Sequence, residues 1–291
     1  MRSRSHSQKI PYTPRDLPLI VKIPVTLKVV SEYLHISKDP KPMPKIRKNV
    51  NPNDLSKLVG KFVSGQIPNL DELNRYFEDD YIEFMKTEKG LVIPGNTVKG
   101  AIRSRLELLM YDSCYNPLGI KRSKTISKRY IKIFHPPRDK DVENFDPESG
   151  QICPVCNLFG NAGLASRVNF SDLELKEGKI DYIPVRGLLY EVAKRGSIFT
   201  GDIIMHAPQP WEIGMLLYGA GYRKGGKWKT ILLGRFKYER KEFGRVQFDI
   251  KIREATSNIR NSIIGKSHDD YLEAFLSKYK DKVRDVEEDW K

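Results

Sequence analysis

The chain has 291 residues and a formal net charge of +14 at pH 7, because 51 lysines and arginines outnumber 37 aspartates and glutamates. Its 30% charged and 39% hydrophobic residues are typical of a folded, basic, soluble protein of one or two domains. Nucleic acid is then the first partner to consider, although lysine-rich surfaces also occur in proteins adapted to high temperature. No long apolar run occurs and the N-terminal stretch MRSRSHSQKIPYTPRD lacks the apolar core of a signal peptide, which excludes a membrane partner and predicts a cytoplasmic protein.

The first element expected along the chain is a strand. Residues 20–30, IVKIPVTLKVV, alternate apolar side chains with Lys22, Thr26 and Lys28, which predicts a half-buried strand with a basic outer face. The pattern then breaks, and we interpret residues 40–90 as an insertion. Two helical patterns, around 55–63 and 70–84, lie inside it.

A basic helix is expected after the turn Pro94-Gly95. Apolar residues recur at helical spacing from Val98 to Leu109, and Asn96 or Thr97 is the expected N-cap. Backbone amides from Gly95 onward can donate to a phosphate, and Lys99 and Arg103 lie four residues apart on one face. An ordinary solvated helix face is the alternative interpretation.

The second half of the chain mixes strands and helices. RVNFSDLEL and SIFTGDIIM predict strands, a helix is expected near Pro210, and the C-terminal region 268–288 predicts a helix with an apolar stripe of Tyr271, Phe275 and Tyr279. Strands and helices do not alternate strictly. The expected fold class is therefore α+β with a mostly antiparallel sheet.

The three cysteines point to a metal site rather than to disulfides, because their number is odd. Cys153 and Cys156 have the spacing that directs two thiolates at one tetrahedral ion, and Cys114 and His135 flank the same irregular region. We expect a structural zinc ion in the region 112–163, closing a loop that has little apolar content. The alternative is that Cys114 is simply buried and that Cys153 and Cys156 are reduced and bind no metal.

A glycine-rich basic segment, residues 219–245, interleaves glycines with cations and aromatic residues such as Arg235, Lys237 and Tyr238. Glycines permit close backbone approach, cations neutralise phosphates and aromatic faces stack on unpaired bases. Single-stranded nucleic acid is the expected ligand. Glycine-rich basic loops also occur as plain hairpins.

Four stretches, in this order, resemble the RAMP superfamily of type III CRISPR effector complexes: LVIPGNTVKGAIRSRLELL, ICPVCNLFGNAGLASRVNFSDLEL, EVAKRGSIFTGDIIM and LGRFKYERKEFGRVQFDI. The resemblance implies a single domain with a ferredoxin-like, RNA-recognition-type core that serves antiviral defence. The partners it implies are CRISPR RNA, target RNA, other RAMP subunits and the large subunit of the complex.

The resemblance also implies roles for individual residues. The RNA contacts that it implies are Lys99, Arg103, Arg167, Gly234, Arg235, Gly244 and Arg245. Cutting subunits of the family carry an acidic residue in the loop after the first strand, where this chain has Asp39, close to His35.

Three functions remain open at this point. A guide-RNA-binding structural subunit is the first. The second is a target-RNA endoribonuclease that uses Asp39 with Mg²⁺ or Mn²⁺. In that case, the expectation for His35 is still a packed or exposed histidine at the end of a strand rather than a general base. The third is a stand-alone, zinc-stabilised binder of single strands.

Overall fold

The computed structural model describes residues 9–37, 43–47, 49–66, 76–111, 113–114, 127–136, 145–259 and 264–288. Its α-helices are α1 (Pro52–Val63), α3 (Gly95–Leu109), α5 (Lys128–Phe134), α6 (Pro154–Phe159), α7 (Pro210–Gly219) and α8 (His268–Tyr279). Its longer strands are β2 (Ile20–Val29), β4 (Met43–Ile46), β5 (Phe77–Ile82), β7 (Gly90–Ile93), β9 (Val168–Phe170), β10 (Leu173–Glu177), β11 (Ile180–Val185), β12 (Leu188–Lys194), β13 (Ile198–His206) and β17 (Arg245–Ile250). The strands of two residues are β1 (Ile10–Pro11), β3 (Tyr33–Leu34), β6 (Lys86–Thr87), β8 (Gln151–Ile152), β14 (Tyr222–Arg223), β15 (Lys227–Trp228), β16 (Ile231–Leu232) and β18 (Thr256–Ser257). None of these helices is long and apolar enough to span a bilayer.

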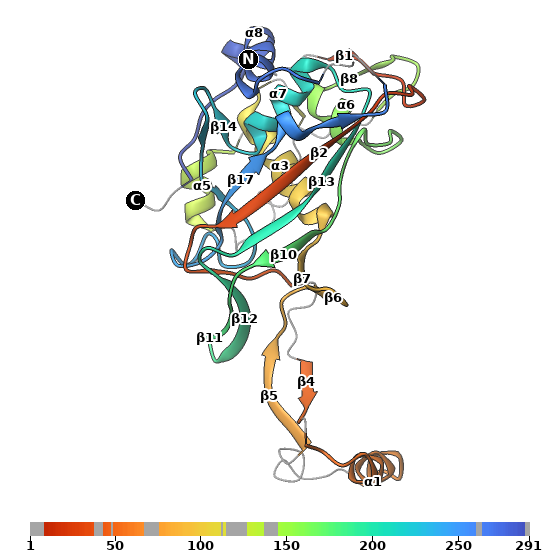
Figure 1. Ribbon diagram of the computed structural model, residues 1–291, viewed down its shortest axis with the longest axis vertical. Coiled ribbons are helices and arrows are strands. Elements are labelled where there is room, and N and C mark those ends of the chain that lie inside the picture. Colours follow the sequence, from red (N-terminus) through yellow and green to blue (C-terminus); the bar gives the residue numbers. More distant parts are fainter. Residues whose placement is uncertain are drawn as a thin grey trace, which may run out of the picture.

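A curled antiparallel sheet with the order β16-β17-β2-β13-β10-β7-β6 forms the centre of the fold (Figure 1). β2 lies between β17 and β13, and its register with β13 runs from Ile20 opposite His206 to Lys28 opposite Ile198. On its inner face, Val21, Ile23, Val25, Leu27 and Val29 are at most 1% exposed, whereas Lys22 and Lys28 are exposed. The predicted strand, its basic outer face and the α+β class are confirmed. The ferredoxin-like arrangement stays a prediction.

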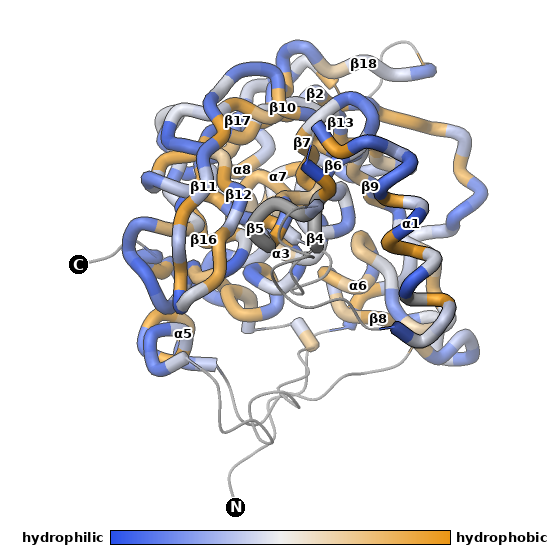
Figure 2. The backbone as a smooth tube through the Cα atoms, turned by 90° about the horizontal axis from the view of Figure 1, so that it is seen from below, coloured by the Kyte–Doolittle hydropathy of each residue, from blue (hydrophilic) through white to orange (hydrophobic). Residues whose placement is uncertain are grey.

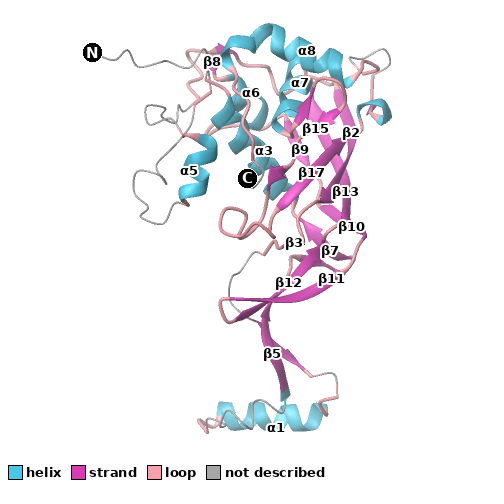
Figure 3. Cartoon of the chain, turned by 90° about the vertical axis from the view of Figure 1, so that its left-hand side faces the viewer, coloured by secondary structure: helices cyan, strands magenta, loops and turns pink. Residues whose placement is uncertain are grey.

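The helices α3, α6, α7 and α8 gather on one side of this sheet (Figure 3). α7 begins at Pro210 as expected, because Gln209 and Glu212 form a capping box at its start. Gly214 lets α7 approach α8 closely, since a Cβ there would lie 1.9 Å from the carbonyl oxygen of Tyr271. The predicted apolar stripe of α8 is buried in this contact.

The C-terminal helix is shorter than the predicted 268–288. It ends at Tyr279, and the residues that follow dock on the end of α3 instead of continuing the helix. The amide of Tyr111 donates to the carbonyl of Lys282, and the amide of Arg284 donates to the carbonyl of Leu109. These backbone bonds satisfy groups at the end of α3 and explain why the chain leaves the helical path.

The predicted insertion contains an arm that extends away from the body, formed by β4, β5 and α1 (Figure 1). The helical pattern around 55–63 is confirmed as α1, along which apolar and polar residues alternate (Figure 2). The second helical pattern is wrong for residues 77–82, because β5 pairs with β4 and, in parallel, with β12. Pairing with distant strands overrides local helical spacing there.

The described part of the loop expected within residues 112–163 contains the helix α5. Ser127 caps α5 by accepting a hydrogen bond from the amide of Arg129, and Phe134 is 1% exposed. Residues 115–126 and 137–144 lie outside the described part of the chain.

Candidate nucleic-acid groove and metal centre

A cavity of about 620 Å³ lies between α3, α5 and the loop that follows β16. We call it the groove. Its lining residues are Ile36, Ser37, Thr97, Gly100, Ala101, Ser104, Arg105, Leu108, Tyr130, Phe134, Leu232, Leu233, Gly234, Arg235, Lys237, Tyr238 and Glu288. These residues come from segments far apart in the sequence, so the groove exists only in the folded chain.

One face of α3 forms a wall of the groove. Thr97, Gly100, Ser104 and Leu108 recur every three or four residues and therefore form one stripe along the helix. Small side chains at the first three positions leave room for a ligand. Sequence reasoning missed this stripe, although its spacing was visible.

The start of α3 is packed and capped, which corrects the expected phosphate site at Gly95. Gly95 is buried, and a Cβ there would lie 2.1 Å from the carbonyl oxygen of Phe170. Its amide donates to the carboxylate of Asp172 at 2.9 Å. The helix begins at Gly95 with Pro94 as its N-cap, rather than Asn96 or Thr97, because an acidic side chain from the β9–β10 connection already accepts from this amide.

The glycine-rich loop opposite α3 is held against β3. Gly234 has a φ of +82° and lies against His35, while Gly244 has a φ of +74° and lies against Leu233. The amide of Arg235 donates to the carbonyl of His35 at 3.0 Å. Gly234 lines the groove, whereas Gly244 is buried and affects only the conformation of the loop, so both RNA contacts stay predictions.

Two cations from this loop face the groove. The Arg235 guanidinium lies 5.4 Å from the ring centres of Tyr190 and Phe236, and the Lys237 ammonium lies 5.3 Å from the Tyr238 ring centre. Neither forms an ion pair within the described residues. Burial lowers the pKa of Lys237. The groove therefore carries two cations that form no ion pair among the described residues, while Glu288, the carboxylate in its lining, is paired with Arg105.

Lys99 and Arg103 do not line the groove. They lie on a different face of α3 from Thr97 and Ser104, and Arg103 on this face lies beside Cys156. Arg103 Nε donates to Glu107 Oε1 at 2.8 Å, and its Nη2 lies 3.6 Å from Cys156 Sγ. Burial, and then the charge of Arg103, lower the pKa of Lys99.

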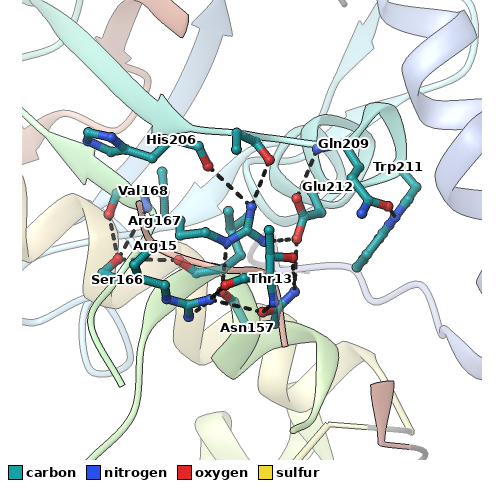
Figure 4. Close-up of polar contacts among 12 residues, drawn as sticks. Thr13, Arg15, Asn157, Ser166, Arg167, Val168, His206, Gln209, Trp211 and Glu212 are labelled. Carbon is teal, nitrogen blue, oxygen red and sulfur yellow. Dashed lines mark hydrogen bonds and ion pairs between the residues drawn. The ribbon is translucent and has the colours of Figure 1, made fainter. Parts of the chain in front are cut away.

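Arg167 is a structural residue, which corrects its expected role as an RNA contact. Its side chain is 1% exposed, and Figure 4 shows its guanidinium surrounded by protein acceptors. It forms an ion pair with Glu212 and donates to the carbonyl of Ala207 at 2.9 Å. A guanidinium with all these partners inside the protein has no access to a phosphate.

Arg245 opens β17, and its backbone carbonyl accepts from the amides of Val30 and Ser31. It does not line the groove. Its proposed RNA contact stays a prediction.

The three cysteines meet at one buried point. Cys114 Sγ lies 3.3 Å from Cys156 Sγ and 3.5 Å from Cys153 Sγ. Three sulfurs on one tetrahedral zinc ion, each about 2.3 Å from it, lie about 3.8 Å apart, so the trio fits such an ion with little adjustment. Hydrogen bonds from Cys114 and Cys156 lower the pKa of Cys153, whereas hydrogen bonds with Cys114 and Cys153 raise the pKa of Cys156, so without a metal the negative charge of the trio is favoured on Cys153.

His135 is not the fourth ligand of this trio. It ends α5 in a left-handed conformation, is exposed, and lines a separate cavity of about 390 Å³ with Arg129, Lys132 and Arg284. Among the described residues, the group that can hold a metal contains only the three cysteines. The expected Cys₃His set is therefore corrected to three cysteines.

Asp39 lies outside the described residues, and the nuclease interpretation stays a prediction. His35, close to it in sequence, is 0% exposed, and its Nδ1 lies 2.7 Å from the carbonyl oxygen of Glu191. Burial lowers the pKa of His35. Of the two expected environments, packed or exposed at a strand end, the structure shows the packed one.

Comparison with known proteins identifies a family for the chain. The sequence model of the RAMP superfamily matches residues 26–291. No curated protein sequence matches the chain.

Proposed function

Because the chain belongs to the RAMP superfamily, a family of CRISPR-associated nucleic-acid-binding subunits, we propose that it binds the guide (CRISPR) RNA of a type III effector complex in the groove. The observation that carries this proposal is the position of Arg235 and Lys237, two cations without described ion-pair partners, on a glycine-rich loop facing the small side chains of α3. We further propose that the chain is a single RAMP-type domain that adjoins other RAMP subunits and the large subunit.

The chemistry of the groove suits the backbone of a single strand. Arg235 and Lys237 can neutralise phosphates, and the hydroxyls of Thr97 and Ser104 can donate hydrogen bonds to phosphate or ribose oxygens. Tyr130 and Tyr238, whose ring centres are 5.3 Å apart, offer aromatic surface to an unpaired base. Phosphate contacts carry no sequence information, which suits a subunit that must hold guides of any sequence.

A structural zinc ion is part of the same proposal. Cys114, Cys153 and Cys156 would hold it, and it would fix α6 and the end of α3 by cross-linking them. The ion would supply folding free energy and not reaction chemistry, because its ligands are buried thiolates.

The test compares two charge-matched double variants. Arg235→Gln with Lys237→Gln removes the two groove cations, while Lys224→Gln with Lys227→Gln removes two cations of the same glycine-rich segment that lie outside the groove. Binding of single-stranded oligouridylate RNA is measured by fluorescence anisotropy over a range of salt concentrations.

We expect the groove variant to lose affinity and its log-log salt slope to fall by about 1.4, which is about 0.7 for each lost phosphate contact. The control variant should keep the wild-type slope. Equal losses in both variants would show that RNA binds through diffuse surface charge, and would overturn the assignment of the groove.

A further inference from the structure

The side chain of Arg103 is fixed between a carboxylate and a cysteine sulfur. Its Nε donates to Glu107 Oε1 at 2.8 Å, an ion pair one helical turn apart, and its Nη2 lies within hydrogen-bond reach of Cys156 Sγ at 3.6 Å. Arg103 is 31% exposed and Glu107 is 14% exposed. The carboxylate therefore holds the guanidinium in place beside the sulfur.

A second side chain from outside the cluster also lies close to the Cys156 sulfur. Asn161 Nδ2 lies 3.5 Å from the same sulfur, so two donors from outside the cluster face Cys156 Sγ. N–H donors around a ligand sulfur fix its orientation and offset part of the negative charge that it carries when a metal is bound. Three thiolates on one divalent ion leave negative charge in a buried place, and a guanidinium is the natural group to offset it.

The Cys156 sulfur and the groove lie on different faces of α3. Arg103 lies on the face toward the cysteines, while Thr97, Gly100 and Ser104 of the same helix line the groove. An arginine that serves the metal centre from this face is poorly placed to contact RNA in the groove as well.

We propose that Arg103 is a positioning residue of the metal centre, which orients and charge-balances the Cys156 thiolate from α3, and is not an RNA contact. This inference rests on the proposed zinc ion. Outer partners of metal ligands typically change metal affinity by about 10-fold to 100-fold when they are removed.

The experiment uses the full-length chain and three variants. Arg103→Gln removes the charge, Arg103→Lys keeps it on a shorter donor, and Lys99→Gln is the matched control, because Lys99 lies one turn away on the same helix without a contact to a cysteine sulfur among the described residues. Three quantities are measured. They are the zinc dissociation constant by competition with a chromophoric chelator, the sulfur-to-cobalt charge-transfer absorption of the Co²⁺ form, and oligouridylate affinity at saturating zinc.

We expect Arg103→Gln to weaken zinc binding by about 10-fold to 100-fold and to shift the charge-transfer band, with RNA affinity at saturating zinc within about twofold of wild type. Arg103→Lys should recover part of the zinc affinity, and it provides the readout if Arg103→Gln does not fold. Lys99→Gln should keep the wild-type zinc affinity and band.

Two results would overturn the inference alone. One is a wild-type zinc affinity and charge-transfer band in both Arg103 variants. The other is a loss of RNA affinity at saturating zinc in the Arg103 variants. If the wild-type chain shows no charge-transfer band and no zinc binding, the proposed metal centre fails as well, and the two failures are thereby distinguished.

Discussion

Gly234 lies directly against the backbone of His35: a Cβ at Gly234 would be 2.6 Å from the carbonyl oxygen of His35. The contact ties the glycine-rich loop to the residue that follows β3. Because Gly234 also has a φ of +82°, any other residue at this position meets both backbone strain and a clash.

We therefore predict that Gly234→Ala lowers both stability and RNA affinity. The strain should cost about 1–3 kcal/mol, and the displaced loop should move Arg235 away from its place in the groove. Gly226→Ala is the matched control, because Gly226 has a φ of +76° but no atom within 4 Å of an added Cβ. Urea unfolding and RNA anisotropy measure the two effects. If the two variants bind RNA equally well, the contact with His35 does not shape the groove.

Arg167 should affect stability and not RNA binding. Arg167→Met leaves the buried carboxylate of Glu212 without its ion-pair partner, which should lower the free energy of unfolding by about 3–5 kcal/mol. Arg195→Met, a change at an exposed arginine, should cost less than about 0.5 kcal/mol. The measurement is urea unfolding, with RNA affinity determined on the folded fraction. If folded Arg167→Met binds RNA more weakly than the wild type, Arg167 contacts RNA as the resemblance implies.

Glu212 allows a sharper form of that test. In Arg167→Met combined with Glu212→Met, no buried charge is left unpaired, so the double variant should be more stable than the single Arg167→Met variant. A double variant less stable than both single variants would indicate that the two residues act separately.

His35 should make stability depend on pH. Burial lowers its pKa below 6.5 in the folded chain, so between the lowered value and 6.5 the unfolded chain binds more protons. Stability then rises with pH across this window and is lost as the pH falls below about 6.5. His35→Gln should remove this component of the slope in urea midpoints between about pH 5 and pH 7. His135→Gln, a change at an exposed histidine, serves as the control. An unchanged slope in His35→Gln would assign the pH dependence to other groups.

The metal content should depend on the cysteines and not on His135. Cys153→Ser should abolish stoichiometric zinc binding and lower the melting temperature, because a structural ion contributes its binding free energy to folding. His135→Ala should retain its zinc, since His135 lines a different cavity. Elemental analysis of the purified variants gives the metal content. Zinc lost from His135→Ala would restore the Cys₃His site expected from the sequence.

Local pattern was enough for several elements and for part of the site. The alternation in β2, the apolar stripe of α8 and the spacing of Cys153 and Cys156 each follow from periodicities that the chain carries in itself. Gly234 and Arg235, which the resemblance implies as RNA contacts, both line the groove. In these cases the neighbours that matter lie within a few residues, or the residue type itself limits the conformation.

Contacts between distant residues decided the rest. The sequence pattern indicated that the amide of Gly95 and the cations Arg103 and Arg167 could bind RNA. In the folded protein, however, Gly95 donates to Asp172, Arg103 lies beside Cys156, and Arg167 pairs with Glu212. β5 became a strand because β4 and β12 lie beside it.

The sequence by itself thus determined the fold class, the family, the cysteine pair and the excess of positive charge. Only the tertiary structure decided which positive charges face the groove. The physical reason is that a cation can bind RNA only when it is not already paired with a carboxylate or carbonyl oxygen of the protein. Such partners can lie tens of residues away in the sequence, as Glu212 does from Arg167.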